Sequence, residues 1–157
     1  MTQRDEVAVR RFVEHMAMAL ANYGFPRMPA RVLMTLMGAD EDGLTATELS
    51  RRLEVSPAAI SGAVRYLLLL GVIVREPVPG SRRDRYVLPD DTWYQAGVVK
   101  AGWLKVLADL AGEGVEALGG RATPSGRRVA EMRDFFLFVQ SDMPALLDRW
   151  EAVRRRG

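Results

Sequence analysis

The chain has 157 residues, 48% of them apolar, and its 22 basic side chains are nearly balanced by 20 acidic ones. This length suits one domain, or one domain with an appendage for oligomerisation, and it is enough to bury a core without disulfides. The absence of cysteine excludes thiolate zinc sites and cysteine nucleophiles, and the single histidine, His15, excludes a multi-histidine metal site. The charged residues at its start lead us to expect no secretory leader, and no run reaches the roughly 20 apolar residues that a membrane helix needs. We therefore expect a cytoplasmic protein with no metal, cofactor or membrane partner.

The start of the chain carries two helical patterns. Apolar residues recur at three- and four-residue spacing over residues 5–22, which predicts an amphipathic helix. Residues 30–37 are apolar almost throughout, and we expect them to form a second, buried helix. A turn rich in glycine and acidic residues follows at 38–43.

Two helices joined by a tight turn are predicted next. Thr45 and Glu48 match a capping box, which begins a short helix. Ser56 is a suitable N-cap and Pro57 a suitable first residue for another helix, which continues to the helix-terminating Gly71. This arrangement has the shape of a helix-turn-helix.

The sequence then changes from a helical to a strand-like pattern. Residues 72–75 and 85–88 are predicted to be two short strands, joined by a turn that contains proline and glycine. Such a hairpin carries Arg82, Arg83 and Arg85 near its tip. A hairpin that follows a helix-turn-helix makes the unit a winged one.

The last part of the chain predicts two long helices. The first covers residues 93–118, and the second follows residues 124–126. Pro144 is expected to kink or interrupt this final helix. The final helix has a heptad spacing of apolar residues, which predicts a seam for another helix. These residues are Val129, Met132, Phe136, Val139, Met143, Leu146, Trp150 and Val153.

The expected fold is therefore mainly α with a small two-stranded β wing. It combines a winged helix-turn-helix with a helical dimerisation domain, because a 157-residue chain cannot cover the long seam by itself. We assign residues 1–24 to an N-terminal dimerisation helix, 25–90 to the winged helix-turn-helix and 91–157 to a C-terminal helical dimerisation domain.

The predicted partner of the winged unit is double-stranded DNA. Residues 43–89 hold seven arginines and four acidic residues, a net charge of +3. In a helix-turn-helix the second helix lies in the major groove, where small side chains allow close approach to the bases. Arginines of a wing neutralise phosphates or enter the minor groove, while Asp84 is expected to orient an arginine. The candidate DNA-binding residues are Ser56, Ala58, Ala59, Ser61, Gly62, Arg65, Arg82, Arg83 and Arg85.

The methionines and aromatic residues outside this unit have two interpretations. They pack a core or a dimer, or they line an adaptable apolar pocket for an effector. Under the second interpretation the candidate ligand-binding residues are Met18, Met34, Trp93 and Phe136.

Two other classes of protein compete with a DNA-binding regulator. A winged helix also serves as a protein-interaction module without DNA binding. An enzyme is disfavoured, because the sequence has no cysteine, a single histidine, no phosphate-binding loop and no metal-ligand spacing.

Residues 45–88 (TATELSRRLEVSPAAISGAVRYLLLLGVIVREPVPGSRRDRYVL) resemble the winged helix-turn-helix of MarR-type bacterial transcription regulators. Residues 12–20 and 128–140 resemble the branch that includes mycobacterial repressors of lipid- and drug-exporting pumps, and the resemblance covers about residues 10–150. It implies a homodimeric repressor that binds an inverted-repeat operator and is released by a small, often lipophilic ligand held between the dimer and DNA-binding domains. It also implies that the small residues and Arg65 of the second helix read bases. The family wing typically carries Asp-x-Arg, whereas this chain has Arg83-Asp84-Arg85.

Overall fold

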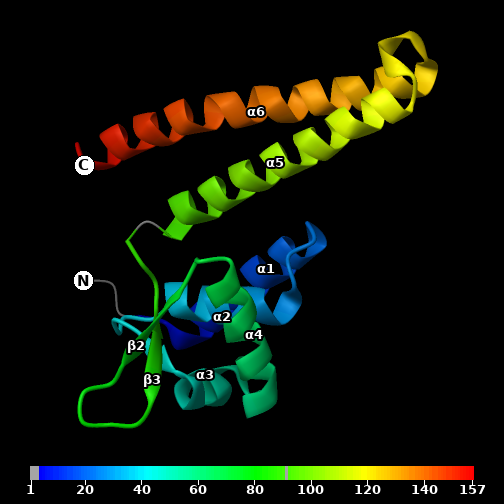
Figure 1. The fold of residues 1–157 in the computed structure, drawn as a ribbon. Coiled ribbons are helices and arrows are strands. Elements are labelled where there is room, and N and C mark those ends of the chain that lie inside the picture. The colour runs from blue at the N-terminus through cyan, green and yellow to red at the C-terminus, as the bar shows by residue number, and fades with distance from the viewer. Residues whose placement is uncertain (1–3, 91) are drawn as a thin grey trace. The chain divides into compact units, whose positions relative to one another are not determined.

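The computed structural model describes residues 4–90 and 92–157, which form two compact units that divide between Thr92 and Trp93 (Figure 1). The first unit contains α1 (Glu6–Asn22), α2 (Arg27–Met37), β1 (Leu44–Thr45), α3 (Ala46–Leu53), α4 (Pro57–Leu69), β2 (Val74–Pro77) and β3 (Asp84–Val87). The second contains α5 (Thr92–Ala117), a short 3-10 helix η1 (Gly120–Ala122) and α6 (Pro124–Arg154). This order confirms the mainly α fold with a β wing.

The core of the first unit forms around α2. This helix contacts α1, α3 and α4, as its nearly continuous apolar sequence predicts. The amphipathic α1 buries Val13 and Ala17 and leaves its opposite face in solvent. The largest fully buried side chains are Val32, Met34, Leu44, Leu49, Ile60, Leu67 and Ile73.

The caps predicted for the helix-turn-helix are confirmed. Thr45 and Glu48 form the full capping box at α3. Ser56 caps α4, with Pro57 in its first turn. Gly71, with φ of 70°, takes the left-handed conformation just beyond the end of α4, and such a position favours glycine.

The described part of the first unit holds a three-stranded antiparallel sheet in the order β1-β3-β2. The predicted hairpin is β2–β3, and β1, where Leu44 pairs with Tyr86, was not predicted. This strand explains Gly43, because a Cβ there would lie 2.8 Å from the Tyr86 carbonyl oxygen. Because β1 directly precedes α3, its pairing with β3 joins the wing to the start of the helix-turn-helix.

The predicted bounds of the hairpin strands were wrong by one or two residues. The first strand begins at Val74 and not at Val72, because Val72 and Ile73 are buried directly after α4. The Val72 N–H donates to the Leu67 carbonyl at the end of that helix, which removes it from strand pairing. The second strand begins at Asp84.

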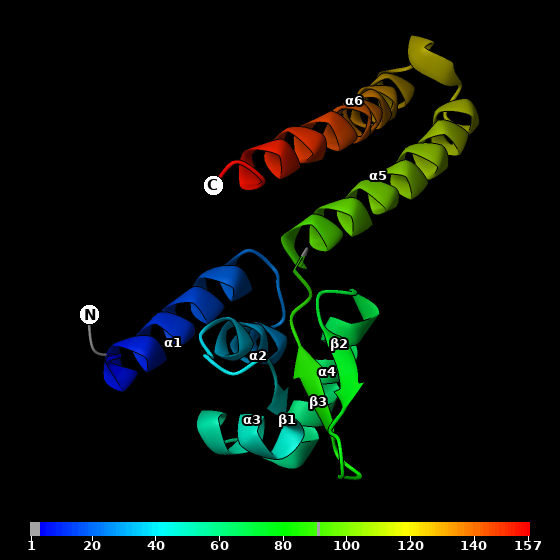
Figure 2. The same ribbon diagram turned by 90° about the vertical axis from the view of Figure 1, so that its left-hand side faces the viewer.

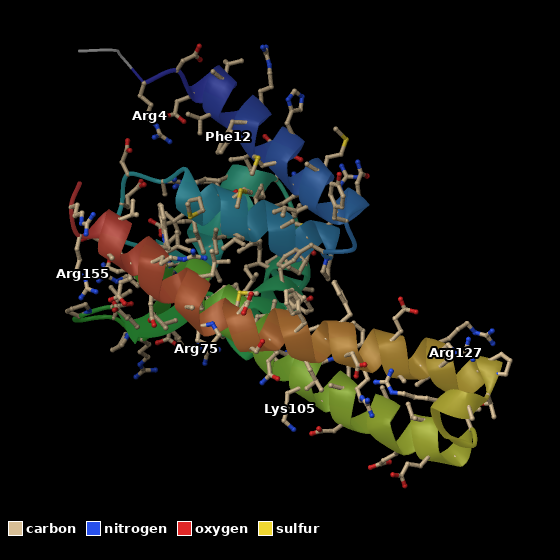
Figure 3. The ribbon with its side chains drawn as sticks, turned by 90° about the horizontal axis from the view of Figure 1, so that it is seen from above. Arg4, Phe12, Arg75, Lys105, Arg127 and Arg155 are labelled. Atoms are coloured by element: carbon tan, nitrogen blue, oxygen red, sulfur yellow. The ribbon has the colours of Figure 1, made fainter. Side chains whose placement is uncertain are left out.

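The second unit is a helical hairpin, whose chain reverses at η1 between α5 and α6 (Figures 1 and 2). The reversal requires a glycine at residue 126, because a Cβ there would lie 2.0 Å from the Gly120 carbonyl oxygen. Lys105 and Arg127 point into solvent from the two helices (Figure 3). The outer surface of the hairpin also carries apolar side chains, such as Trp103 and Phe138.

The predicted start of the final helix was wrong, and the interruption that was one of the two effects predicted for Pro144 does not occur. The helix begins at Pro124 because the Thr123 hydroxyl accepts a hydrogen bond from the Gly126 N–H over 3.0 Å and acts as the cap. It also continues without interruption through Pro144 to Arg154. Pro144 is exposed, so water can bond the backbone carbonyl that the missing N–H leaves unpaired.

Candidate nucleic-acid interface

The exposed stripe of α4 is narrow and almost uncharged. Ala58, Ser61, Gly62 and Arg65 are exposed at helical spacing. The side of α4 that faces the core carries Ile60, Ala63, Val64 and Leu67. Arg65 is the only residue on the stripe that is both long and charged, and within the described chain its side chain has no hydrogen-bond or ion-pair partner.

The first turn of α4 is held in a fixed orientation. The Ser56 hydroxyl accepts a hydrogen bond from the Ala59 N–H over 3.2 Å, and Ala59 itself is half-buried. The turn before it is closed by Glu54, whose φ is 55°, and by the Ser50 hydroxyl, which donates to the Val55 carbonyl over 2.6 Å. Candidates Ser56 and Ala59 therefore shape the helix start, while Ala58 has an exposed side chain.

Gly62 leaves open space on the exposed stripe. An added Cβ at this position would meet no atom within 4 Å in the described structure. Glycine in a helix interior costs about 1 kcal/mol relative to alanine. Packing within the described chain therefore does not account for the glycine.

The tip of the wing presents two arginines to solvent. The tip turns at Gly80, and Ser81 fixes it by accepting a hydrogen bond from the Arg83 N–H over 3.1 Å. Arg82 and Arg83 are exposed. Neither guanidinium has a hydrogen bond or an ion pair with any residue that the structure describes.

The stem of the wing is neutralised by ion pairs between its strands. Arg85 on β3 bonds Glu76 on β2, with Nη2 to Oε2 at 2.9 Å, so this predicted wing residue already has a carboxylate partner. Asp84 pairs with Arg75 at 3.7 Å. Asp84 thus orients an arginine, as predicted, and its partner belongs to the opposite strand. Arg75 also lies over the Tyr86 ring, 5.9 Å from its centroid.

The wing tip, α3 and the first turn of α4 lie at the same end of the first unit in Figure 1, and Figure 2 agrees for the tip and α3. Arg51 of α3 is exposed, and its side chain forms no hydrogen bond or ion pair with the described residues. Its neighbour Arg52 pairs with Glu41 instead. Arg51 contributes to the positive charge of residues 43–89 but is not among the predicted DNA-binding residues.

The residues predicted to bind a ligand are not brought together in either unit. Met34 lies in the core of the first unit at 2% exposure, and Met18 on α1 is 54% exposed. Phe136 is half-buried on α6 of the second unit, and the side chain of Trp93 lies outside the described residues. A cavity of about 460 Å³ opens between α1, α2 and α3; most of its lining residues are charged, and none of these four is among them.

The second unit exposes many large apolar side chains. Phe135 and Phe138 of α6 are 61% and 65% exposed. Several predicted seam residues are exposed as well; they are Met132, Leu146, Trp150 and Val153. On α5 the exposed apolar residues are Trp103, Val106 and Leu110. Patches of this kind in soluble proteins mark interaction sites.

Family models match most of the chain. The MarR family model matches residues 23–84, and the model described as an MmpR5-like MarR family transcriptional regulator matches residues 91–154. The chain belongs to the MarR family of transcriptional regulators. No described helix of this MarR regulator is long and apolar enough to cross a membrane.

Two relatives agree with the family assignment. The HTH-type transcriptional regulator MmpR5 of Mycobacterium tuberculosis (strain ATCC 25618 / H37Rv) is 29% identical over 92% of this chain and 88% of its own. A crystal structure described as a transcriptional regulator matches with a TM-score of 0.82 and 29% identity, over 92% of this chain and 99% of that one. The predicted resemblance to MarR-type regulators, including the mycobacterial branch, is confirmed.

Proposed function

We propose that this MarR family regulator binds double-stranded DNA as a homodimer and represses transcription from an inverted-repeat operator. The observation that carries the proposal is that the first turn of α4, where the slim exposed stripe begins, lies at the same end of the first unit as the wing tip (Figure 1). The two exposed arginines of that tip form no hydrogen bond or ion pair with the described residues. As a regulator that binds DNA, it is expected to act in the cytoplasm, and the family gives no reason to expect catalysis.

The recognition helix in this proposal is α4. Its first turns carry Ala58, Ser61 and Gly62, whose small side chains permit the helix backbone to approach the floor of the major groove. Alanine methyl groups suit contact with thymine methyls, and Arg65 suits bidentate bonding to guanine. Base recognition would therefore depend on the close fit of α4 in the major groove and on one charged contact, from Arg65.

The wing supplies the electrostatic part of the proposed contact. Arg82 and Arg83 are exposed at the hairpin tip and need not break an internal ion pair to reach a phosphate or the minor groove. A guanidinium fork matches phosphate geometry well. The free tip of the wing thus supports binding beside the groove that α4 would enter.

A homodimer is supported by the apolar surface of the second unit. Phe135, Leu146 and Val153 lie along α6 in positions that a single copy leaves exposed. Two-fold pairing through the terminal helices would cover them and present two recognition helices. Such helices reach successive major-groove half-sites about 34–36 Å apart, which matches an inverted repeat.

Release by a small lipophilic ligand is the part of the proposal that rests on family resemblance. A ligand that binds more tightly to a conformation with displaced recognition helices would weaken operator binding by that difference in affinity. Met18, Met34, Trp93 and Phe136 stay predictions for its binding site.

Selection of bound duplexes from a random DNA pool tests the proposal. We expect enrichment of an inverted repeat by the unmodified regulator, and loss of that enrichment when Arg65, Arg82 and Arg83 are all replaced by alanine. No enrichment at low salt would contradict DNA recognition and favour a protein-interaction module. Enrichment of a single, unrepeated half-site would contradict the symmetric dimer.

A further inference from the structure

The arginines at the DNA-facing end of the first unit fall into two groups. The side chains of one group form no hydrogen bond or ion pair with the described residues: Arg51, Arg65, Arg82 and Arg83. The other group is ion-paired within the unit: Arg52, Arg75 and Arg85. The charge of a paired guanidinium is already partly neutralised by its carboxylate, so a phosphate gains less from a paired arginine than from an unpaired one. Residue type alone therefore does not identify the phosphate contacts.

Arg51 belongs to the group without hydrogen bonds or ion pairs, and it lies on the outer face of α3. The buried face of this helix carries Leu49 and Leu53. Thr47 and Arg51, one turn apart, are exposed on the opposite face. In a helix-turn-helix the first helix crosses the DNA backbone while the second enters the groove. Here α3 is that first helix, and it lies at the end of the unit that holds the wing tip (Figures 1 and 2).

Arg85 differs from the tip arginines in its surroundings. It stands opposite Glu76 in the register of the hairpin, and both Nε and Nη2 bond the same carboxylate oxygen, at 3.3 and 2.9 Å. The neighbouring pair of Arg75 with Asp84 crosses the same two strands. These pairs fix the stem from which Arg82 and Arg83 project.

We propose that Arg51 of α3 is a DNA phosphate contact and that Arg85 is a positioning residue, which holds the wing through Glu76 and does not touch DNA. This inference rests on the proposed function, since it divides roles within the same DNA-binding surface. It adds Arg51 to the predicted DNA-binding residues and removes Arg85 from them.

The salt dependence of binding to a short mixed-sequence duplex tests the role of Arg51. Each lost phosphate contact lowers the slope of log affinity against log salt by about 0.9 per bound protomer. We expect Arg51→Ala to lower the slope by this amount, as Arg82→Ala and Arg83→Ala do. Arg52→Ala removes the same charge from the same helix at a paired position, and its slope should equal that of the unmodified protein.

Removing Glu76 tests the role of Arg85. If Arg85 positions the wing, Glu76→Ala and Arg85→Ala both weaken binding several-fold, and Glu76→Ala leaves the salt slope unchanged. If Arg85 contacts phosphate, Glu76→Ala frees it, so that both affinity and slope rise. The two roles therefore predict opposite directions for one variant.

The outcomes separate this inference from the proposed function. An unchanged slope in Arg51→Ala, with lower slopes in Arg82→Ala and Arg83→Ala, would overturn the assignment of Arg51 and leave DNA binding intact. Tighter binding by Glu76→Ala would overturn the positioning role of Arg85. Failure of the unmodified protein to bind any duplex at low salt would contradict the proposed function itself. Circular dichroism melting checks that each variant is folded.

Discussion

Thr45 and Glu48 satisfy each other's backbone groups at the start of α3. The Thr45 N–H donates to Oε2 of Glu48 over 2.8 Å, and the Glu48 N–H donates to Oγ1 of Thr45 over 3.3 Å. The bond from the Thr45 backbone is the main reason that the pKa of Glu48 lies below its ordinary value. The ionised carboxylate is therefore the form that stabilises the helix on which α4 packs.

Glu48→Ala should lower the free energy of unfolding by about 1 kcal/mol at neutral pH. Because folding lowers the pKa of Glu48, its contribution is complete above the pKa of the unfolded chain and is lost as pH falls through the folded pKa. Urea unfolding should therefore show the difference between variant and parent shrinking between about pH 5 and pH 3. Glu131→Ala, on the exposed surface of α6, is the control. A difference for Glu48→Ala that stays constant over this range would contradict the account.

Arg31 of α2 joins three helices of the first unit. Its guanidinium bonds both carboxylate oxygens of Glu14 on α1, and Nη2 also donates to the Leu53 carbonyl at the end of α3 over 3.3 Å. Arg31→Ala should lower the free energy of unfolding in urea by about 1–2 kcal/mol, since the pair is only partly screened by water. Arg10→Ala removes an exposed arginine of α1 that has no hydrogen bond or ion pair with the described residues, and it should change the free energy of unfolding by less than about 0.5 kcal/mol. Equal effects of the two substitutions would show that the pair contributes nothing.

Leu146 of α6 tests the dimer. It is 52% exposed within one copy, and burial against a second copy would make a carboxylate there costly. Leu146→Glu should shift the protein toward monomer in sedimentation equilibrium by at least about tenfold in dissociation constant. Ser141→Glu places the same charge on the opposite side of α6 and should leave the assembly intact. A dimer of unchanged stability in Leu146→Glu would show that the pairing surface lies elsewhere.

The helix-turn-helix could be predicted from sequence because its signals are local. Thr45 with Glu48, and Ser56 with Pro57, lie within a few residues of the groups they cap, so spacing alone identifies the helix starts. Local strand and turn signals also predicted the wing hairpin, although its strand bounds were wrong by one or two residues.

Features that depend on long-range pairing could not be predicted. Strand β1 is two residues long and exists because Leu44 pairs with the distant Tyr86. The ion pair of Glu76 with Arg85 depends on a strand register that the predicted strand, ending at residue 75, did not reach. At Pro144 the predicted interruption does not occur, and the helix continues to Arg154.

Gly62→Ala tests the central claim, that α4 binds DNA through a slim exposed stripe. The new methyl group meets no atom within 4 Å in the described structure, so the free energy of unfolding should rise by up to about 1 kcal/mol. The same methyl group would crowd the duplex, and overpacking of this size costs about 1–3 kcal/mol. Affinity for the enriched repeat, measured by fluorescence anisotropy, should therefore fall by about tenfold or more in a protein that has become more stable. A variant that is more stable and binds the repeat as tightly as the parent would contradict the claim.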